Sequence, residues 1–208
     1  VSCNFKVTKN LALELNKLFL EVIIANGFDN NALKILKTKK NLRLIDGSKY
    51  KSEELLKFVS FNQNIMLQSE DLNLFTKKNF KVVSKRKPTS KQLKDLIFAF
   101  NVCRYVKSNA IVLASNEATV GIGSGQPSRL DSCQIAINKM KKFNLQTDNL
   151  VAASDAFFPF VDGIEKLVQS GVRAVVQPSG SIRDKEIINF ANETDTVLLF
   201  SKTRHFRH

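Results

Sequence analysis

The 208-residue chain has no tryptophan, and its only histidines are His205 and His208, at the end. Its three cysteines, Cys3, Cys103 and Cys133, are far apart and form no CxxC pair, so a structural zinc site is not expected. No apolar run approaches the roughly 20 residues that span a bilayer. Polar residues occur throughout the first part of the chain, whereas a signal peptide has a continuous apolar stretch there. These absences predict a cytoplasmic protein with reduced thiols, no metal and no membrane anchor.

The net charge of +13 is unevenly distributed. Residues 1–107 carry 21 Lys and Arg against 9 Asp and Glu, whereas residues 108–208 are almost balanced. The surplus is mostly lysine, and neither an aromatic-interleaved RNA-binding motif nor a recognition-helix pattern accompanies it. We interpret it as a solvated lysine-rich surface that helps to attract an anionic ligand. Nucleic-acid binding is the less favoured alternative.

Apolar spacing predicts strands that alternate with helices along the chain. The predicted helices are residues 8–20, 30–37, 90–106, 128–143, 162–170 and 184–191, and the predicted strands are residues 21–25, 42–45, 110–114, 118–122, 150–153, 174–177 and 196–200. Residues 49–61 and 63–80 have no clear pattern, and residues 82–89 are the best candidate for a linker. This order predicts an α/β protein, a layered sheet with helices on both faces.

Residues 154–162 read SDAFFPFVD and place three phenylalanines and a proline between two carboxylates. Because Pro159 fixes the backbone, Phe157, Phe158 and Phe160 cannot all enter the same core. At least one should form the wall of a pocket suited to a flat aromatic ligand. The alternative is an apolar strand that runs through a turn into a helix, with ordinary solvent-facing aspartates.

Three further runs carry residues suited to ligand binding. In residues 121–129, GIGSGQPSR, alternate glycines would let backbone amides approach a ligand, the helix start near Ser128 would favour an anion, and Arg129 would add a charge. Residues 177–183, QPSGSIR, end a strand where open α/β sheets contact ligands. The terminal RHFRH is either a solvated basic tail or part of a site.

Together with Lys107-Ser-Asn109, these runs resemble one family over the whole chain. It is the aminoimidazole carboxamide ribonucleotide (AICAR) transformylase domain of the bifunctional purine-biosynthesis enzyme, whose other domain is inosine monophosphate (IMP) cyclohydrolase. The resemblance implies formyl transfer from 10-formyltetrahydrofolate to AICAR, no catalytic zinc, and a homodimer with shared sites. It also implies cytidine-deaminase-like three-layer sandwich lobes. Residues 1–88 would be the remainder of a truncated first lobe plus a connecting segment, and residues 89–208 a complete second lobe.

The resemblance further implies the ligand contacts. Those to the nucleotide are Asn109, Arg129, Phe157 and Arg204. Those to the folate are Leu130, Phe160, Asp162, Ser181, Ile182 and His208. A carboxylate such as that of Asp162 can accept paired hydrogen bonds from a pterin amine and ring N–H. Pro127 and Val161 depart from the residues usual in the family, which puts the loop and the folate affinity in question.

The chemistry needs a proton acceptor and a stabiliser for the oxyanion. In the family these roles fall mainly to a Lys-His pair, and this chain has no Lys-His dipeptide. We therefore expect Asn109 and His208 to be only supporting residues, and the chain, which starts at Val1, to be an inactive C-terminal part of the enzyme. The alternative is a non-catalytic remnant or split-gene product that binds nucleotide or folate, or assembles with a missing N-terminal part.

Overall fold

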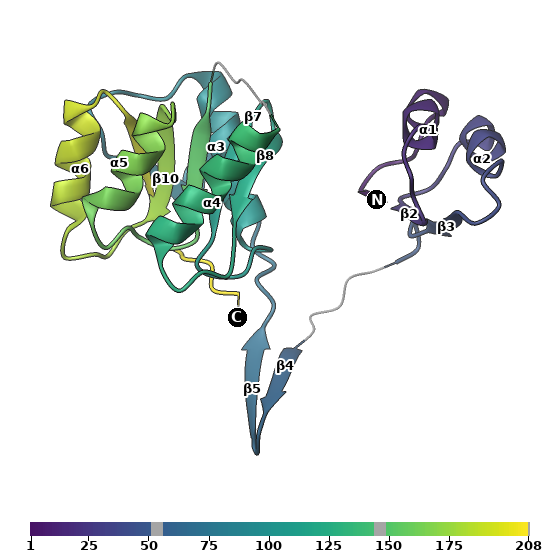
Figure 1. The fold of residues 1–208 in the computed structure, drawn as a ribbon, viewed down its shortest axis with the longest axis horizontal. Coiled ribbons are helices and arrows are strands. Elements are labelled where there is room, and N and C mark those ends of the chain that lie inside the picture. The colour runs from purple at the N-terminus through teal and green to yellow at the C-terminus, as the bar shows by residue number, and fades with distance from the viewer. Residues whose placement is uncertain (51–55, 144–148, 208) are drawn as a thin grey trace. The chain divides into compact units, whose positions relative to one another are not determined.

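The computed structural model describes residues 1–50, 56–143 and 149–207, and the chain divides into two compact units, Val1–Glu70 and Asp71–His208 (Figure 1). His208, one of the predicted folate contacts, lies outside the described residues. Among those residues, no helix combines the length and the apolar character that crossing a membrane requires. The predicted division between residues 88 and 89 concerns family lobes and stays a prediction.

The first unit contains a three-stranded parallel sheet in the order β1-β2-β3. Its elements are β1 (Ser2–Cys3), α1 (Lys9–Asn16), β2 (Val22–Ala25), α2 (Asn30–Leu36) and β3 (Arg43–Asp46). The helices bury Ala12, Leu15, Ala32 and Leu36 in a small core around Ile23. Both predicted helices and both predicted strands of this region are confirmed, and α1 ends earlier than its apolar spacing indicated.

The hairpin of β4 (Leu56–Phe61) and β5 (Asn64–Ser69) turns at Asn62, whose φ is +51°. Phe58 and Leu67 lie directly opposite each other, and both are exposed. Apolar residues occur on both faces of the hairpin, which removes the alternation by which a half-buried strand is recognised. This is why residues 49–61 and 63–80 showed no clear pattern.

The second unit is built on a six-stranded sheet in the order β6-β11-β10-β9-β7-β8. Strands β9, β10 and β11 are parallel to one another, β7 is antiparallel to β8 and β9, and β6 is antiparallel to β11. Its elements are the 3-10 helix η1 (Lys77–Asn79), β6 (Phe80–Val82), α3 (Ser90–Cys103), β7 (Ile111–Ser115), β8 (Ala118–Gly123), α4 (Arg129–Lys142), β9 (Val151–Ser154), α5 (Val161–Gln169), β10 (Ala174–Pro178), α6 (Asp184–Glu193) and β11 (Val197–Ser201).

Helices cover both faces of this sheet (Figure 1). Helices α4, α5 and α6 pack on one face, through Ile137, Ile164 and Ile187 among others. Helix α3 packs on the other face, through Leu96 and Phe100 among others. The predicted α/β sandwich is therefore confirmed, as are the predicted helices and strands of this half to within a few residues.

Local hydrogen bonds fix the helix starts and the β7–β8 turn. Thr89 and Gln92 form a reciprocal capping box at the start of α3, and the Ser128 hydroxyl accepts from the amide of Asp131 at the start of α4. The buried carboxylate of Asp95 accepts the amides of Asn116 and Glu117 at 3.1 and 2.7 Å. Both turn residues have positive φ, so this carboxylate holds the turn that strand β8 follows.

The structure corrects the interpretation of the glycine-rich run. A Cβ at Gly121 would lie 2.2 Å from the carbonyl oxygen of Ala136, and one at Gly123 would lie 1.9 Å from that of Ser132. The close approach that these two glycines permit is therefore that of α4 to β8. Gly125 is the one of the three in the loop, with φ of +67° and its amide donating to the Lys107 carbonyl.

Gly123→Ala is expected to lower the free energy of unfolding by about 1–3 kcal/mol or more, because the new methyl group must push α4 away from β8. Urea unfolding monitored by circular dichroism measures this. Thr119→Ser, on the exposed part of the same strand, is the control and should change stability by no more than about 0.5 kcal/mol. Equal effects of the two substitutions would contradict the packing role of Gly123.

Burial controls the chemistry of two of the three thiols. It raises the pKa of Cys103 well above its ordinary value, and it raises the pKa of Cys133 to about 12. Both thiols are therefore neutral in the folded protein near neutral pH. Cys3 is only partly buried.

A thiol reagent at pH 8 should modify Cys3 in the native protein and reach Cys103 and Cys133 only after unfolding.

Because the folded pKa values of Cys103 and Cys133 are raised, these thiols hold their protons in the folded state after the unfolded chain has released them. Stability should therefore be unaffected by them below about pH 8.5 and should fall as the pH rises further. Mass spectrometry of labelled peptides and urea titrations at pH 7.5 and 10 measure the two effects.

Candidate functional site

The runs predicted to bind ligands converge on one edge of the six-stranded sheet. Because β9, β10 and β11 are parallel, their carboxyl ends meet at the same edge, followed by residues 155–160, 179–183 and 202–207. Strand β7 is antiparallel to β9 and begins there, after Ser108 and Asn109. Strand β8 ends there and leads into residues 124–129. The topology thus brings five separate segments to one place.

A cavity of about 480 Å³ lies at this edge, between the start of α4 and the start of α5. Five of the residues predicted from the sequence line it, namely Asn109 and Arg129 from the nucleotide set and Leu130, Phe160 and Asp162 from the folate set. The remaining lining residues are Pro127, Ser128, Phe158, Pro159 and Gly163. One concave site therefore contains residues from both predicted sets.

The three phenylalanines of residues 154–162 lie in different surroundings, as expected from the backbone that Pro159 fixes. Phe158 is buried in the core, Phe157 is half-buried, and Phe160 is 51% exposed and lines the cavity. The ring of Phe158 lies 2.7 Å from where a Cβ at Gly163 would be, so only glycine lets α5 start so close to it. The prediction that one of these rings forms a pocket wall is confirmed.

Arg129, the first residue of α4, is held by a buried ion pair. Its Nη2 donates to Asp155 Oδ1 at 2.7 Å, and its Nε donates to the Ser154 hydroxyl at 2.9 Å. The two side chains are 10% and 0% exposed. The Ser108 hydroxyl donates to the other oxygen of the Asp155 carboxylate. These bonds set the direction of the guanidinium of Arg129, which lines the cavity.

Asn109 connects the start of β7 to the loop before α4. Its Nδ2 donates to the carbonyls of Gln126 and Pro127 at 2.9 and 3.1 Å, and its own carbonyl accepts from the Ser132 hydroxyl. The peptide bond between Ser108 and Asn109 is cis. Since both Nδ2 hydrogens are used, a ligand would meet the Oδ1 of Asn109. Pro127, the departure noted in the sequence, contributes its carbonyl to this connection.

The other predicted residues lie outside the cavity lining. Phe157 is half-buried, Arg204 is exposed, and Ser181 and Ile182 lie in the loop that follows β10. This loop is connected to the cavity, because the Arg183 guanidinium lies 4.7 Å from the centre of the Phe160 ring. Val161, the second departure, is half-buried against the core and adds no charge at the start of α5.

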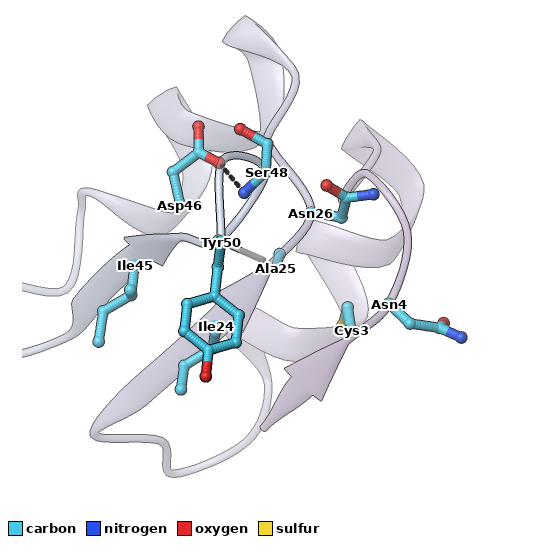
Figure 2. A pocket seen from close by; sticks show the side chains of 10 residues that line it. Cys3, Asn4, Ile24, Ala25, Asn26, Ile45, Asp46, Ser48 and Tyr50 are labelled. Atoms are coloured by element: carbon cyan, nitrogen blue, oxygen red, sulfur yellow. Dashed lines mark hydrogen bonds between the residues drawn. The ribbon is translucent and has the colours of Figure 1, made fainter. Parts of the chain in front are cut away.

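A second cavity, of about 670 Å³, occurs in the first unit at the carboxyl ends of its parallel strands (Figure 2). Asp46 at the end of β3, Ser48 just beyond it and Asn26 after β2 line it, and the Ser48 amide donates to Asp46 Oδ1 at 2.9 Å. The hydrogen bonds to Ser48 lower the pKa of Asp46. Sequence reasoning selected none of these residues, although polar residues directly after two parallel strands are a usable signal. Among the described residues, no group of three or more His, Cys, Asp and Glu side chains could hold a metal ion.

Comparisons with known proteins point to one family. The profile of the AICARFT/IMPCHase bienzyme family matches residues 1–139. Proteins named "Bifunctional purine biosynthesis protein PurH" are 46% identical to this chain in Aquifex aeolicus and 44% identical in Persephonella marina, each over 100% of the chain and 40% of the relative. The protein of that name from Buchnera aphidicola is 46% identical over 93% of the chain and 37% of the relative. The chain thus spans about two fifths of the length of these relatives.

Asp155→Asn is expected to lower the free energy of unfolding by about 3–5 kcal/mol, because it leaves the Arg129 guanidinium buried without its counter-charge. Chemical denaturation of the chain provides the measurement. Asp195→Asn is the matched control, since Asp195 pairs with Arg86 at an exposed position and should contribute no more than about 1 kcal/mol. If both substitutions cost the same, the Asp155 pair does not hold the site together.

Proposed function

Because the chain belongs to the AICARFT/IMPCHase bienzyme family, we propose that it is part of an AICAR formyltransferase of purine biosynthesis. In this reaction the exocyclic amine of AICAR attacks the formyl carbon of 10-formyltetrahydrofolate, and the formylated nucleotide and tetrahydrofolate are released. The named relatives support a role in purine biosynthesis. The choice of the formyl-transfer activity rests on the resemblance of the site residues to the transformylase domain.

One observation carries this proposal: the 480 Å³ cavity is lined by predicted contacts to both substrates. Asn109 and Arg129 line it beside Leu130, Phe160 and Asp162. Formyl transfer requires the nucleotide amine and the folate formyl group to meet, so contacts to the two ligands must lie within one site. A site for the nucleotide alone would not need the second set of residues.

Arg129, Phe160 and Asp162 each have a chemical role in this proposal. The Arg129 guanidinium donates to an anionic or carbonyl oxygen of the nucleotide, and Phe160 offers an apolar face to the pterin. One oxygen of the exposed Asp162 carboxylate accepts the Gly163 amide, and this bond fixes the orientation of the carboxylate. In this orientation the carboxylate accepts hydrogen bonds from the pterin amine and ring N–H. Ser181 and Ile182 would meet the folate from the neighbouring loop, and Phe157 and Arg204 the nucleotide.

This chain supplies binding and orientation, and proton transfer depends on residues elsewhere in the protein. Attack by the amine needs a base, and the oxyanion of the tetrahedral intermediate needs a donor or a cation. The chain has no Lys-His dipeptide. We propose that a Lys-His pair in another segment of the full-length protein performs the proton transfer, with His208 in support, and that the full-length protein acts as a homodimer in the cytoplasm.

In the full-length protein, Arg129→Lys should raise the KM for AICAR, and Asp162→Asn should raise the KM for 10-formyltetrahydrofolate. Each change removes or weakens one hydrogen bond to a charged group, so each KM is expected to rise about tenfold or more while the other KM changes little. Steady-state kinetics with each substrate varied in turn measures both constants. The control is Glu165→Gln, an exposed carboxylate one turn further along α5. Equal rises in both KM values for either variant would contradict the division of roles.

The missing Lys-His dipeptide also favours a second candidate, a non-catalytic module that binds nucleotide or folate, or assembles with another chain. Isothermal titration with AICAR and a folate analogue distinguishes the two, with and without the remaining protein supplied in trans. Binding with turnover supports the formyltransferase, and binding without turnover supports the module. Binding of neither ligand, even with the remaining protein present, rules out the formyltransferase and a ligand-binding module, and leaves assembly with another chain to be measured by the molar mass of the mixture.

A further inference from the structure

The last described residues have no regular secondary structure and are held along the edge of the sheet where the cavity lies. We name residues 203–207 the C-terminal strap. The His205 amide donates to the Asp155 carbonyl at 2.8 Å, and the Ser108 amide donates to the Arg207 carbonyl at 3.0 Å. The strap is thus tied to the residue that holds Arg129 and to the residue that precedes Asn109. Two segments that line the cavity therefore fix its path.

The strongest anchor of the strap is the side chain of His205, which is 1% exposed. The centre of its ring lies 5.0 Å from that of Phe75 and 4.5 Å from that of Phe100. Its Nδ1 is bonded to the carboxylate of Asp71, whose Oδ1 also accepts the amide of Asn73 at 3.4 Å. Its neighbours Arg204 and Phe206 are exposed, so the burial of His205 requires a specific cause.

Packing alone does not explain a histidine at this position. The surrounding rings form an apolar slot that leucine or phenylalanine would fill without a desolvation cost. The Nε2 atom of His205 is buried, and in the described part of the chain it has no hydrogen-bond partner. The desolvation of Nε2 is unfavourable, and what distinguishes histidine from leucine or phenylalanine at this position is the one directional bond between Nδ1 and Asp71. Buried polar pairs of this kind select one register over others.

Register matters here because exposure alternates along the strap, with Arg204 and Phe206 exposed and His205 between them buried. With His205 turned into the slot, Arg204 and Phe206 lie on the opposite side, where the Arg204 guanidinium is 4.9 Å from the centre of the Phe206 ring. A slip of the strap by one residue would turn Arg204 toward the phenylalanine slot and His205 toward solvent. The His205–Asp71 bond discriminates against this slip, because no residue of the strap except His205 can make it with a ring that fits the slot.

We propose that His205 and Asp71 are positioning residues that fix the register of the C-terminal strap, so that Arg204 is presented to the nucleotide. This inference rests on the proposed function, in which Arg204 contacts AICAR. It assigns a role to two residues that touch neither substrate. It also predicts a specific result, namely that loss of the pair weakens nucleotide binding and leaves the folate site unchanged.

Two variants of the full-length protein separate positioning from stability. His205→Phe keeps a ring in the slot and removes the unpartnered nitrogen, so its unfolding temperature should not fall. Asp71→Asn keeps the shape of the partner and removes its charge. Each is expected to raise the KM for AICAR on the order of tenfold, the equivalent of about 1.4 kcal/mol, and to leave the KM for 10-formyltetrahydrofolate within about twofold. The double variant should lose no more than the larger single one, because His205→Phe removes the same bond that Asp71→Asn weakens.

Hydrogen exchange of the backbone amides provides a readout that does not depend on activity. The amides of His205 and Ser108 should exchange faster in both variants, while those of α3 stay protected. Asp195→Asn, which changes an exposed ion pair of the same unit, is the control and should alter none of these values.

Unchanged exchange at His205 and Ser108 would overturn the proposed anchoring, whether or not the protein is active. Faster exchange with an unchanged KM for AICAR would overturn the positioning of Arg204. If the unmodified protein binds AICAR but transfers no formyl group, the proposed reaction fails and the dissociation constant for AICAR replaces the KM. If it does not bind AICAR, both the proposed function and the positioning of Arg204 fail, and exchange then reports on the anchoring alone.

Discussion

The candidate site depends on the ion pair and the hydrogen bonds that the buried carboxylate of Asp155 makes. Its side chain accepts from Arg129 and Ser108, its amide donates to the Ala110 carbonyl, and its own carbonyl accepts from the amide of His205. A carboxylate without exposure is tolerated only when its charge is paired and its oxygens are bonded. The segment before β7 and the start of α4 therefore meet at the Asp155 carboxylate, and the backbone of His205 meets the same residue at its carbonyl.

The edge of the sheet explains why this hub can exist. Strand ends in an α/β sheet leave carbonyl and amide groups without ladder partners, and polar side chains after the strands replace those partners. Asn109, just before β7, illustrates this, since its Nδ2 donates to the carbonyls of Gln126 and Pro127 in the loop after β8 and the residue lines the cavity. The same groups that complete the backbone hydrogen bonding also form the rim of the cavity. Structural and binding roles are consequently combined in this part of the protein.

Much of the fold could be predicted from the sequence, because apolar spacing and capping residues act locally. Thr89, Ser128 and the alternation of strands with helices were sufficient to predict the helices and strands from residue 90 onward and the helical layer on each face of the sheet, whereas β6 (Phe80–Val82) was missed. The hairpin of β4 and β5 was not predictable in this way, since Phe58 and Leu67 share one face and Val59 and Phe61 the other.

The site was predictable in part, because it is made of contiguous runs that a known family shares. The resemblance selected five residues that prove to line one cavity. What the sequence could not provide were pairings between distant residues. Asp71 and His205 are 134 positions apart, and nothing local to either one indicates the other. The role of Gly121 and Gly123 was not predictable for a related reason, because the neighbour of each is the backbone of a helix that follows it in the chain.

That helix contact bears on how the site would respond to a ligand. Gly121 and Gly123 place β8 directly against the backbone of α4, so the helix has little freedom to shift or to roll. Its first turn, with Ser128 and Arg129, is consequently ordered before anything binds. The conformational entropy of these groups is lost during folding and is not lost again on association. The binding free energy at this end of the cavity would therefore come from the contacts with the ligand, and the cost of ordering the protein would offset little of it.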